Sequence, residues 1–123
     1  MNIVDFIKAR LDDDERIAQA AFLATMPGTE SWTVVAMQVW SEHDPKTLVV
    51  NHTWPKEGEH IARHDPARVL RQCAALRETI RLVDELAFDA NGNGSELTLW
   101  NYLSPLASIW SDHPDYQQDW SDD

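Results

Sequence analysis

Apolar side chains near the amino terminus recur at the spacing of a helix. Five positions define this stripe: Val4, Ile7, Leu11, Ala18 and Ala21. Asn2, with Asp5 three residues later, resembles a polar N-cap followed by an acidic residue in the first turn. We therefore predict a helix from about Ile3 to Leu23, ended by Met26-Pro27-Gly28, with the acidic run from Asp12 to Glu15 on a solvated face.

Two later segments are rich in β-branched and aromatic residues, which favour strands. They are Trp32–Trp40 and Thr47–Asn51, separated by turn-forming residues from Ser41 to Lys46, so an antiparallel hairpin is the simplest connection. Two strands alone are marginally stable, so we expect the hairpin to pack on a helix or to pair with a third strand, which a second copy of the chain could supply. Alternation along the first strand would place Trp32 and Trp40 on one face.

Asp65-Pro66 is typical of a helix start, because the carboxylate can cap free amides and proline fits the first helical position. The apolar residues that follow form a seam at intervals of four and three, made of Val69, Cys73, Leu76, Ile80, Val83 and Ala87. We expect the first helix to pack on this seam, with a homodimer as the alternative. The exposed face would consist of Arg71, Glu78, Arg81 and Glu85.

The last third of the chain predicts a break at Asn91–Ser95 and then a helical pattern from Glu96 to Trp110, interrupted at Pro105. One kinked helix or two short helices would satisfy this pattern, and a short terminal helix carrying Tyr116 and Trp120 would follow. A chain of 123 residues is long enough for one core. The elements predict a single α+β domain over 1–123, with a long N-terminal helix, a β-hairpin, a central amphipathic helix and short C-terminal helices.

The formal net charge of −11 argues against direct binding of nucleic acid, which normally requires a basic face. The stretch Asp89–Asp123 holds seven acidic residues and no Lys or Arg. It could attract a basic protein partner, or it could serve only to keep the protein soluble.

No targeting or membrane segment is indicated. Runs of about 18 apolar residues are absent, and acidic residues stand where a signal peptide would have its apolar core. The single cysteine, Cys73, cannot form an internal disulfide. We expect a buried thiol in a protein of the reducing cytoplasm, with a reactive thiol as the alternative.

His60 and His64 stand four residues apart, so on a helix both imidazoles would face one side and could share a divalent metal ion. His113, Asp112 or Asp65 could complete the ligand set. The glutamate of the HExxH pattern, which would supply a general base, is missing between the two histidines. A structural role, in which the histidines close a loop onto a helix, is the alternative.

No catalytic motif accompanies these histidines. None of the serines lies in a Gly-x-Ser-x-Gly elbow, and the four glycines form neither a phosphate-binding loop nor a dinucleotide fingerprint. We expect no cofactor other than the divalent metal just considered.

Six tryptophans are many for so small a core, and tryptophan is enriched at protein interfaces. Large rings that simply fill the core are the alternative. Five aromatic residues are predicted to contact a partner: Trp54, Trp100, Trp110, Tyr116 and Trp120.

Three blocks of the sequence resemble an uncharacterised family, a domain of unknown function, of small acidic proteins from actinobacteria and their phages. The blocks are LDDDERIAQAA (Leu11–Ala21), HIARHDPARVL (His60–Leu70) and SDHPDY (Ser111–Tyr116). The recurrent positions are His60, His64, Asp65, Pro66, Arg68, His113, Pro114 and Tyr116. The resemblance implies a cytoplasmic bacterial or phage setting and names no substrate or catalytic residue. Family members often carry a cysteine-containing segment before the terminal motif, which this chain lacks.

The favoured function is a non-enzymatic module that binds another protein. The negative charge of the chain favours a basic partner. If the chain comes from a phage or prophage, it would modulate a protein of the host. The alternative is a small metal-binding protein or metal-dependent hydrolase that uses His60, His64 and His113.

Overall fold

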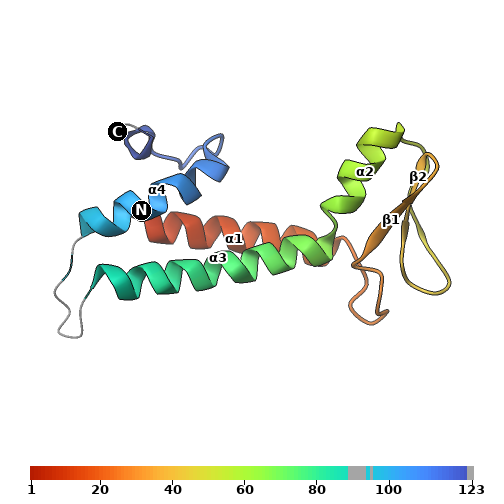
Figure 1. The fold of residues 1–123 in the computed structure, drawn as a ribbon, viewed down its shortest axis with the longest axis horizontal. Helices are drawn as coiled ribbons and strands as arrows, with labels where there is room; N and C mark the ends of the chain where they lie inside the picture. The colour runs from red at the N-terminus through yellow and green to blue at the C-terminus, as the bar shows by residue number, and fades with distance from the viewer. Residues whose placement is uncertain (89–93, 95, 122–123) are drawn as a thin grey trace. The chain divides into compact units, whose positions relative to one another are not determined.

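A computed structural model describes residues 1–88, 94 and 96–121 of the chain and shows the predicted α+β fold (Figure 1). Its elements, in order, are α1 (Ile3–Ala20), β1 (Trp32–Val35), β2 (Gln38–Ser41), β3 (Leu48–Val50), α2 (Pro55–Arg63), α3 (Pro66–Ala87), α4 (Glu96–Ala107) and the 3₁₀ turns η1 (Ser108–Trp110) and η2 (Gln118–Trp120).

The chain separates into two compact units, and α1 and α3 contribute residues to both. Unit 1 comprises Met1–Asp13 and Ala74–Asp123, and unit 2 comprises Asp14–Cys73. That the whole chain folds as one domain stays a prediction.

Helix α1 begins as predicted, because the Asp5 N–H donates to Asn2 Oδ1 at 2.8 Å. It ends at Ala20, before the predicted Leu23. The Ala21 N–H bonds the Ala18 carbonyl, and the Leu23 N–H then donates to the hydroxyl of the buried Thr29 at 3.1 Å. The loop therefore satisfies backbone groups that a longer helix would have used.

The segment predicted as one strand, Trp32–Trp40, is two strands joined by a tight turn. In the β1–β2 pair Trp32 lies opposite Ser41 and Val35 opposite Gln38, so the turn consists of Ala36 and Met37. Ala36 takes a φ of 55°, which alanine rarely adopts. Because opposite residues share a face, Trp32 and Trp40 lie on opposite faces of the sheet, and the prediction of a shared face is wrong.

Strand β3 completes an antiparallel sheet in the order β1-β2-β3. It pairs with β2 through Val39 opposite Val50 and Trp40 opposite Leu48, with an irregularity between the two pairs. The third strand, for which a second copy of the chain was one possible source, therefore belongs to the same chain.

Helix α2, which the sequence did not predict, packs on β1 and β2 (Figure 1). Pro55 stands in its first turn, after Trp54 in an extended conformation. Gly58 is buried, and a Cβ added there would lie 2.9 Å from Thr53 Cγ2 and 3.0 Å from Val34 Cγ2. Glycine thus allows the helix to approach the sheet closely.

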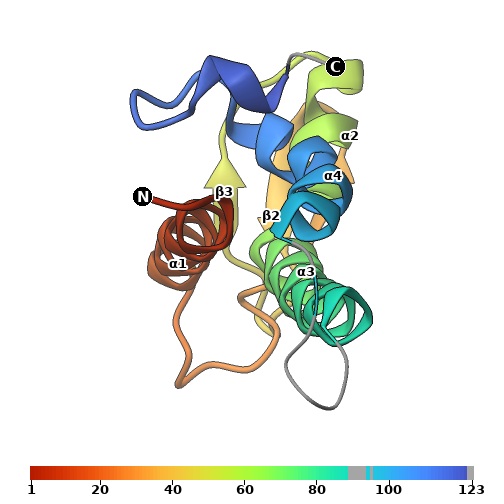
Figure 2. The same cartoon turned by 90° about the vertical axis from the view of Figure 1, so that its left-hand side faces the viewer.

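Helix α3 confirms the predicted seam. Cys73, Ile80 and Ala87 are buried and the intervening seam residues are half-buried, whereas the predicted outer face is exposed. Within unit 1 the second half of α3 lies beside the first part of α1 (Figures 1 and 2), and Arg77 Nη2 lies 2.5 Å from Asp12 Oδ1.

The C-terminal segment completes the core of unit 1. The predicted break at Asn91–Ser95 lies outside the described residues except for Gly94, which pairs with Phe88 in an isolated bridge. Helix α4 passes through Pro105 and becomes the 3₁₀ turn η1 at Ser108. The buried apolar residues of unit 1 include Ile3, Phe6, Ile7, Leu11, Ile80, Ala87, Leu103, Ala107, Tyr116 and Trp120.

Candidate interaction groove

The Asp65 carboxylate ties the start of α3 to the start of β1. Its Oδ1 accepts a hydrogen bond from the Arg68 N–H at 2.9 Å, which caps the helix, and its Oδ2 accepts one from the Trp32 N–H at 3.0 Å. The Ala67 N–H also donates to the Glu30 carbonyl at 3.0 Å. Two hydrogen bonds therefore hold the backbone at Glu30 and Trp32 against the start of α3, and the bond from Arg68 fixes the orientation of the Asp65 carboxylate.

His64 closes the end of α2. Its backbone N–H donates to the His60 carbonyl at 3.1 Å, and its Nδ1 lies 2.9 Å from the same oxygen. A carbonyl oxygen only accepts, so the hydrogen of the neutral His64 ring lies on Nδ1. The His60 and His64 rings lie close together, with centroids 4.4 Å apart. This geometry fits the structural alternative for the pair.

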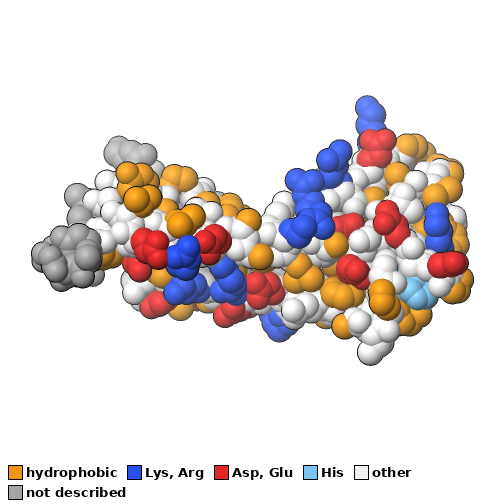
Figure 3. Space-filling view, turned by 60° about the horizontal axis from the view of Figure 1, so that its bottom comes forward, with side chains coloured by type: hydrophobic (Ala, Val, Ile, Leu, Met, Phe, Trp, Pro, Cys, Tyr) orange, Lys and Arg blue, Asp and Glu red, His pale blue; other side chains and the backbone are white. Residues whose placement is uncertain are grey.

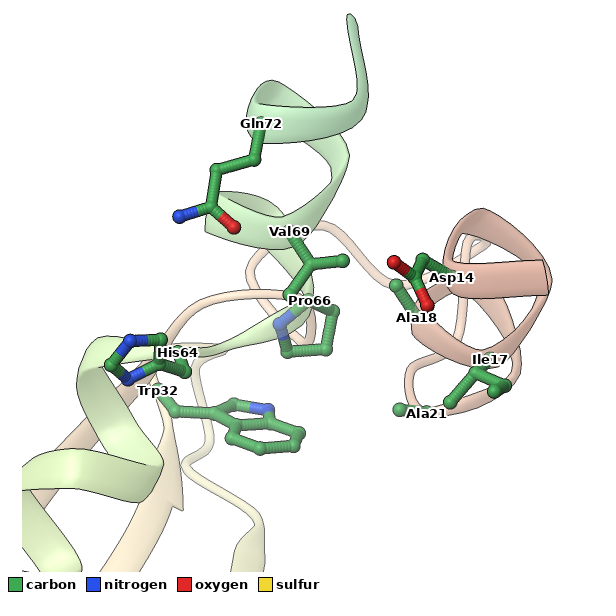
Figure 4. Close-up of a pocket in the computed structure, with 9 residues that line it drawn as sticks. All are labelled: Asp14, Ile17, Ala18, Ala21, Trp32, His64, Pro66, Val69 and Gln72. Atoms are coloured by element: carbon green, nitrogen blue, oxygen red, sulfur yellow. The ribbon is translucent and has the colours of Figure 1, made fainter. Parts of the chain in front are cut away.

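Between these elements and the second part of α1 lies an open hollow of about 390 Å³, which we call the Trp32 groove (Figure 4). Trp32, His64 and Pro66 lie on one side, Ile17 and Ala18 of α1 and Ala21 just after it lie on the other, and Val69 stands between them; Asp14 and Gln72 complete the lining. All of these residues belong to unit 2.

A second hollow of unit 2 shares Trp32 and Ala21 with the Trp32 groove. It measures about 280 Å³, and its lining includes Leu23, Met26, Leu48 and Val49. We call it the Leu48 hollow. Figure 3 shows exposed hydrophobic side chains around the strands, at the right of the view.

Large apolar side chains stand in solvent along both hollows. Ile17 is 61% exposed and Leu23 59%, and Leu48 and Val49 are exposed too. Among the described residues, neither lining contains a cysteine. The surface is therefore suited to receiving apolar side chains.

His113 is held in unit 1 by groups that only donate hydrogen bonds. Arg10 Nη1 lies 2.9 Å from its Nδ1, and the Asp115 N–H donates to the same nitrogen at 3.0 Å. Nδ1 therefore accepts, and the hydrogen of the neutral ring lies on Nε2. To bind a metal, His113 would have to give up the contacts at Nδ1 or the proton at Nε2.

The three histidines predicted as metal ligands lie in different units, His60 and His64 in unit 2 and His113 in unit 1. In the part of the chain that the structure describes, no group of three or more His, Cys, Asp or Glu side chains is arranged to hold a metal ion. Even without His113, His60 and His64 provide a close pair of imidazoles, as the metal hypothesis requires.

The aromatic residues predicted to contact a partner differ in accessibility. Trp54 is 66% exposed, and Trp100 and Trp110 are half-buried. Tyr116 and Trp120 are buried, with ring centroids 6.0 Å and 5.0 Å from the Phe6 ring, so in this fold they serve the core of unit 1.

Sequence reasoning missed the Trp32 groove. Its lining combines residues from Leu11–Ala21, Trp32 at the start of β1, and residues from His64–Val69. These three segments are far apart in the sequence. Ile17, an apolar residue just after the acidic run Asp12–Glu15, is a local signal in the sequence. Its 61% exposure is known only from the structure.

Comparisons with known proteins give a family without an assigned activity. No curated protein and no solved structure matches the chain, and among the described residues no helix has the length and apolar character needed to cross a membrane. A family model matches residues 1–122. The chain belongs to that family, described as a family of unknown function (DUF6221).

Proposed function

We propose that the protein is a non-enzymatic protein-interaction module, and that the Trp32 groove and the Leu48 hollow together form its contact surface. The observation that carries this proposal is the exposure of Ile17, Leu23, Leu48 and Val49 along two hollows that share Trp32. Contiguous exposed apolar surface is typical of interaction sites in small proteins. An apolar side chain of the partner would enter the groove and lose its contact with water.

Trp32 is well suited to be the centre of such a contact. Its backbone N–H is bonded to Asp65, and its indole Nε1 donates to the Thr29 carbonyl at 3.1 Å. A ring held in place at both ends loses little conformational freedom when a partner binds. Tryptophan is also among the residues that contribute most to binding at interfaces.

The charge of the chain favours a basic partner. A net charge of −11 speeds the approach of positively charged proteins and repels nucleic acids. The resemblance of the three sequence blocks supports a setting in the cytoplasm of an actinobacterium or its phage, where the protein would modulate a host protein.

Photo-crosslinking tests this proposal. A photoreactive amino acid at Gln72, at the rim of the groove, would be activated in cells that produce the protein, and crosslinked partners would be identified by mass spectrometry. The Ile17→Glu variant places a charge in the groove and should abolish the specific crosslink. The control variant is Leu86→Glu, which makes the same change at a residue of α3 that is 81% exposed and lies outside the groove.

A crosslinked protein that survives Leu86→Glu but not Ile17→Glu would support the proposal. Equal crosslinking in all three proteins, or none in any, would contradict it. A second copy of the chain is one partner that the same experiment can reveal, and sedimentation equilibrium would then show a dimer that Ile17→Glu dissociates.

A further inference from the structure

The negative charge of the chain is concentrated in unit 1. By sequence, unit 1 has four Lys or Arg residues and thirteen Asp or Glu residues, which gives a formal charge of −9. Unit 2 has six and eight, which gives −2. A basic partner is therefore drawn mainly to unit 1, the unit that does not contain the Trp32 groove.

Unit 1 has a hollow of its own, of about 440 Å³, that combines aromatic rings with carboxylates. Its lining includes Phe88, Trp100 and Trp120 together with Asp84 and Asp119, and residues 1–4 form another part of the wall. We call it the Trp100 hollow. Among the lining residues that the structure describes there is no Lys, Arg or His.

The two carboxylates of the Trp100 hollow are available to a ligand. Asp84 and Asp119 are both exposed, and within the described residues neither side chain has a hydrogen bond or an ion pair. By contrast, Asp12 is paired with Arg77, and Asp13 with Arg10. Asp84 and Asp119 thus place two unneutralised charges beside aromatic surface.

We propose that the Trp100 hollow binds the guanidinium group of an arginine side chain carried by a basic segment of a partner protein. A guanidinium is planar, stacks on aromatic faces and donates paired hydrogen bonds to carboxylates. It is more weakly hydrated than an ammonium group, so it loses less on entering a partly apolar site. The charge of a lysine side chain also complements the carboxylates, but its ammonium group is not planar and cannot stack on the aromatic walls.

This site goes beyond the proposed function of the Trp32 groove and does not depend on it. The groove would receive apolar side chains in unit 2, and the Trp100 hollow would receive a cation in unit 1. Either can fail in experiment without the other.

Nuclear magnetic resonance titration of the full ¹⁵N-labelled chain tests the inference. The probe is a blocked peptide with two arginines spaced by glycines, compared with the same peptide containing lysines. We expect the arginine peptide to shift the indole N–H signals of Trp100 and Trp120, and the lysine peptide to bind several-fold more weakly.

Variants with the same change in charge distinguish binding at the Trp100 hollow from general electrostatic attraction to the protein. Asp84→Asn/Asp119→Asn should weaken binding of the arginine peptide about tenfold, because it removes both negative charges, and one acceptor oxygen from each side chain, while keeping side-chain size. Glu42→Gln/Glu59→Gln changes two exposed carboxylates of unit 2 by the same charge and should weaken binding less than about twofold. Thermal melts would check that both variants are folded.

Three results would overturn the inference: equal weakening in the two variants, equal affinity for the arginine and lysine peptides, or shifts that avoid both indoles. If a variant is destabilised, the signals that shift in the unmodified protein still test the inference.

Discussion

Replacing Asp65 by alanine removes two hydrogen bonds in unit 2 at once. The N-cap of α3 loses its acceptor for the Arg68 N–H, which costs about 1 kcal/mol of folding stability. The half-buried Trp32 backbone loses its acceptor 3.0 Å away, and an unsatisfied donor costs about 1–3 kcal/mol. We therefore expect Asp65→Ala to lower the free energy of unfolding by about 2–4 kcal/mol.

Two further variants show how much of this loss of folding stability belongs to each hydrogen bond. Asn caps helices as well as Asp does, but its amide nitrogen cannot accept, so Asp65→Asn should keep one bond and lose about 1–2 kcal/mol. Asp112 also stands near a proline, is exposed and, among the described residues, makes no side-chain hydrogen bond. Asp112→Ala should therefore change stability by less than about 0.5 kcal/mol.

Urea denaturation followed by far-ultraviolet circular dichroism measures the loss, and amide hydrogen exchange at Trp32 and Arg68 locates it. Faster exchange at Trp32 alone is expected for Asp65→Asn, and at both residues for Asp65→Ala. A loss below about 0.5 kcal/mol for Asp65→Ala, or one equal to that of Asp112→Ala, would refute the role assigned to the Asp65 carboxylate.

Three other outcomes follow from the structure. Gly58→Val should lower the unfolding free energy by about 1–3 kcal/mol, because the new side chain would overlap Thr53 and Val34; unchanged denaturation would contradict the close packing. The hydrogen bond from Arg81 holds the pKa of Glu78 below its usual value, so this pair stabilises the fold above the unfolded pKa and loses its effect as pH falls through the folded pKa. Arg81→Ala should return the Glu78 pKa to its ordinary value in a carbon-detected titration, and a pKa that stays low would exclude Arg81 as the cause. If His60 and His64 are structural, tag-free protein should contain zinc, manganese, nickel and iron well below one ion per chain; near-stoichiometric metal that His60→Ala/His64→Ala removes would favour the metal hypothesis instead.

Helix α3 could be predicted because independent signals agree on it. Asp65-Pro66 marks its start, and the apolar seam from Val69 to Ala87 keeps a helical period throughout. The first helix was predicted equally well at its start, where Asn2 caps it. Its end was missed because Thr29, outside the helix, decides where the backbone leaves it.

The turn at Ala36-Met37 and helix α2 could not be predicted from local pattern. The turn contains no glycine, proline or asparagine, and apolar strand-forming residues flank it, so the sequence continues as if it were one strand. Helix α2 is only nine residues long, and the apolar side of so short a segment includes Gly58, which carries no side chain, so the local pattern is too brief to predict a helix. The packing of α2 on the sheet depends on tertiary structure.

The candidate site was found only in part. His60, His64 and Asp65 were singled out from the sequence, and of these His64 lines the Trp32 groove. Nothing in their spacing indicates Ile17, which the fold brings to the same groove as His64. The carboxylates of Asp84 and Asp119 likewise lie far apart in the sequence and line one hollow.

The six tryptophans divide evenly between the units, Trp32, Trp40 and Trp54 in unit 2 and Trp100, Trp110 and Trp120 in unit 1. They also span the range from the exposed Trp54 to the buried Trp120. The protein's intrinsic ultraviolet emission is therefore a sum of blue-shifted and red-shifted contributions from both units. An emission spectrum taken during unfolding can resolve whether the units melt together, provided that each tryptophan is replaced by phenylalanine in turn.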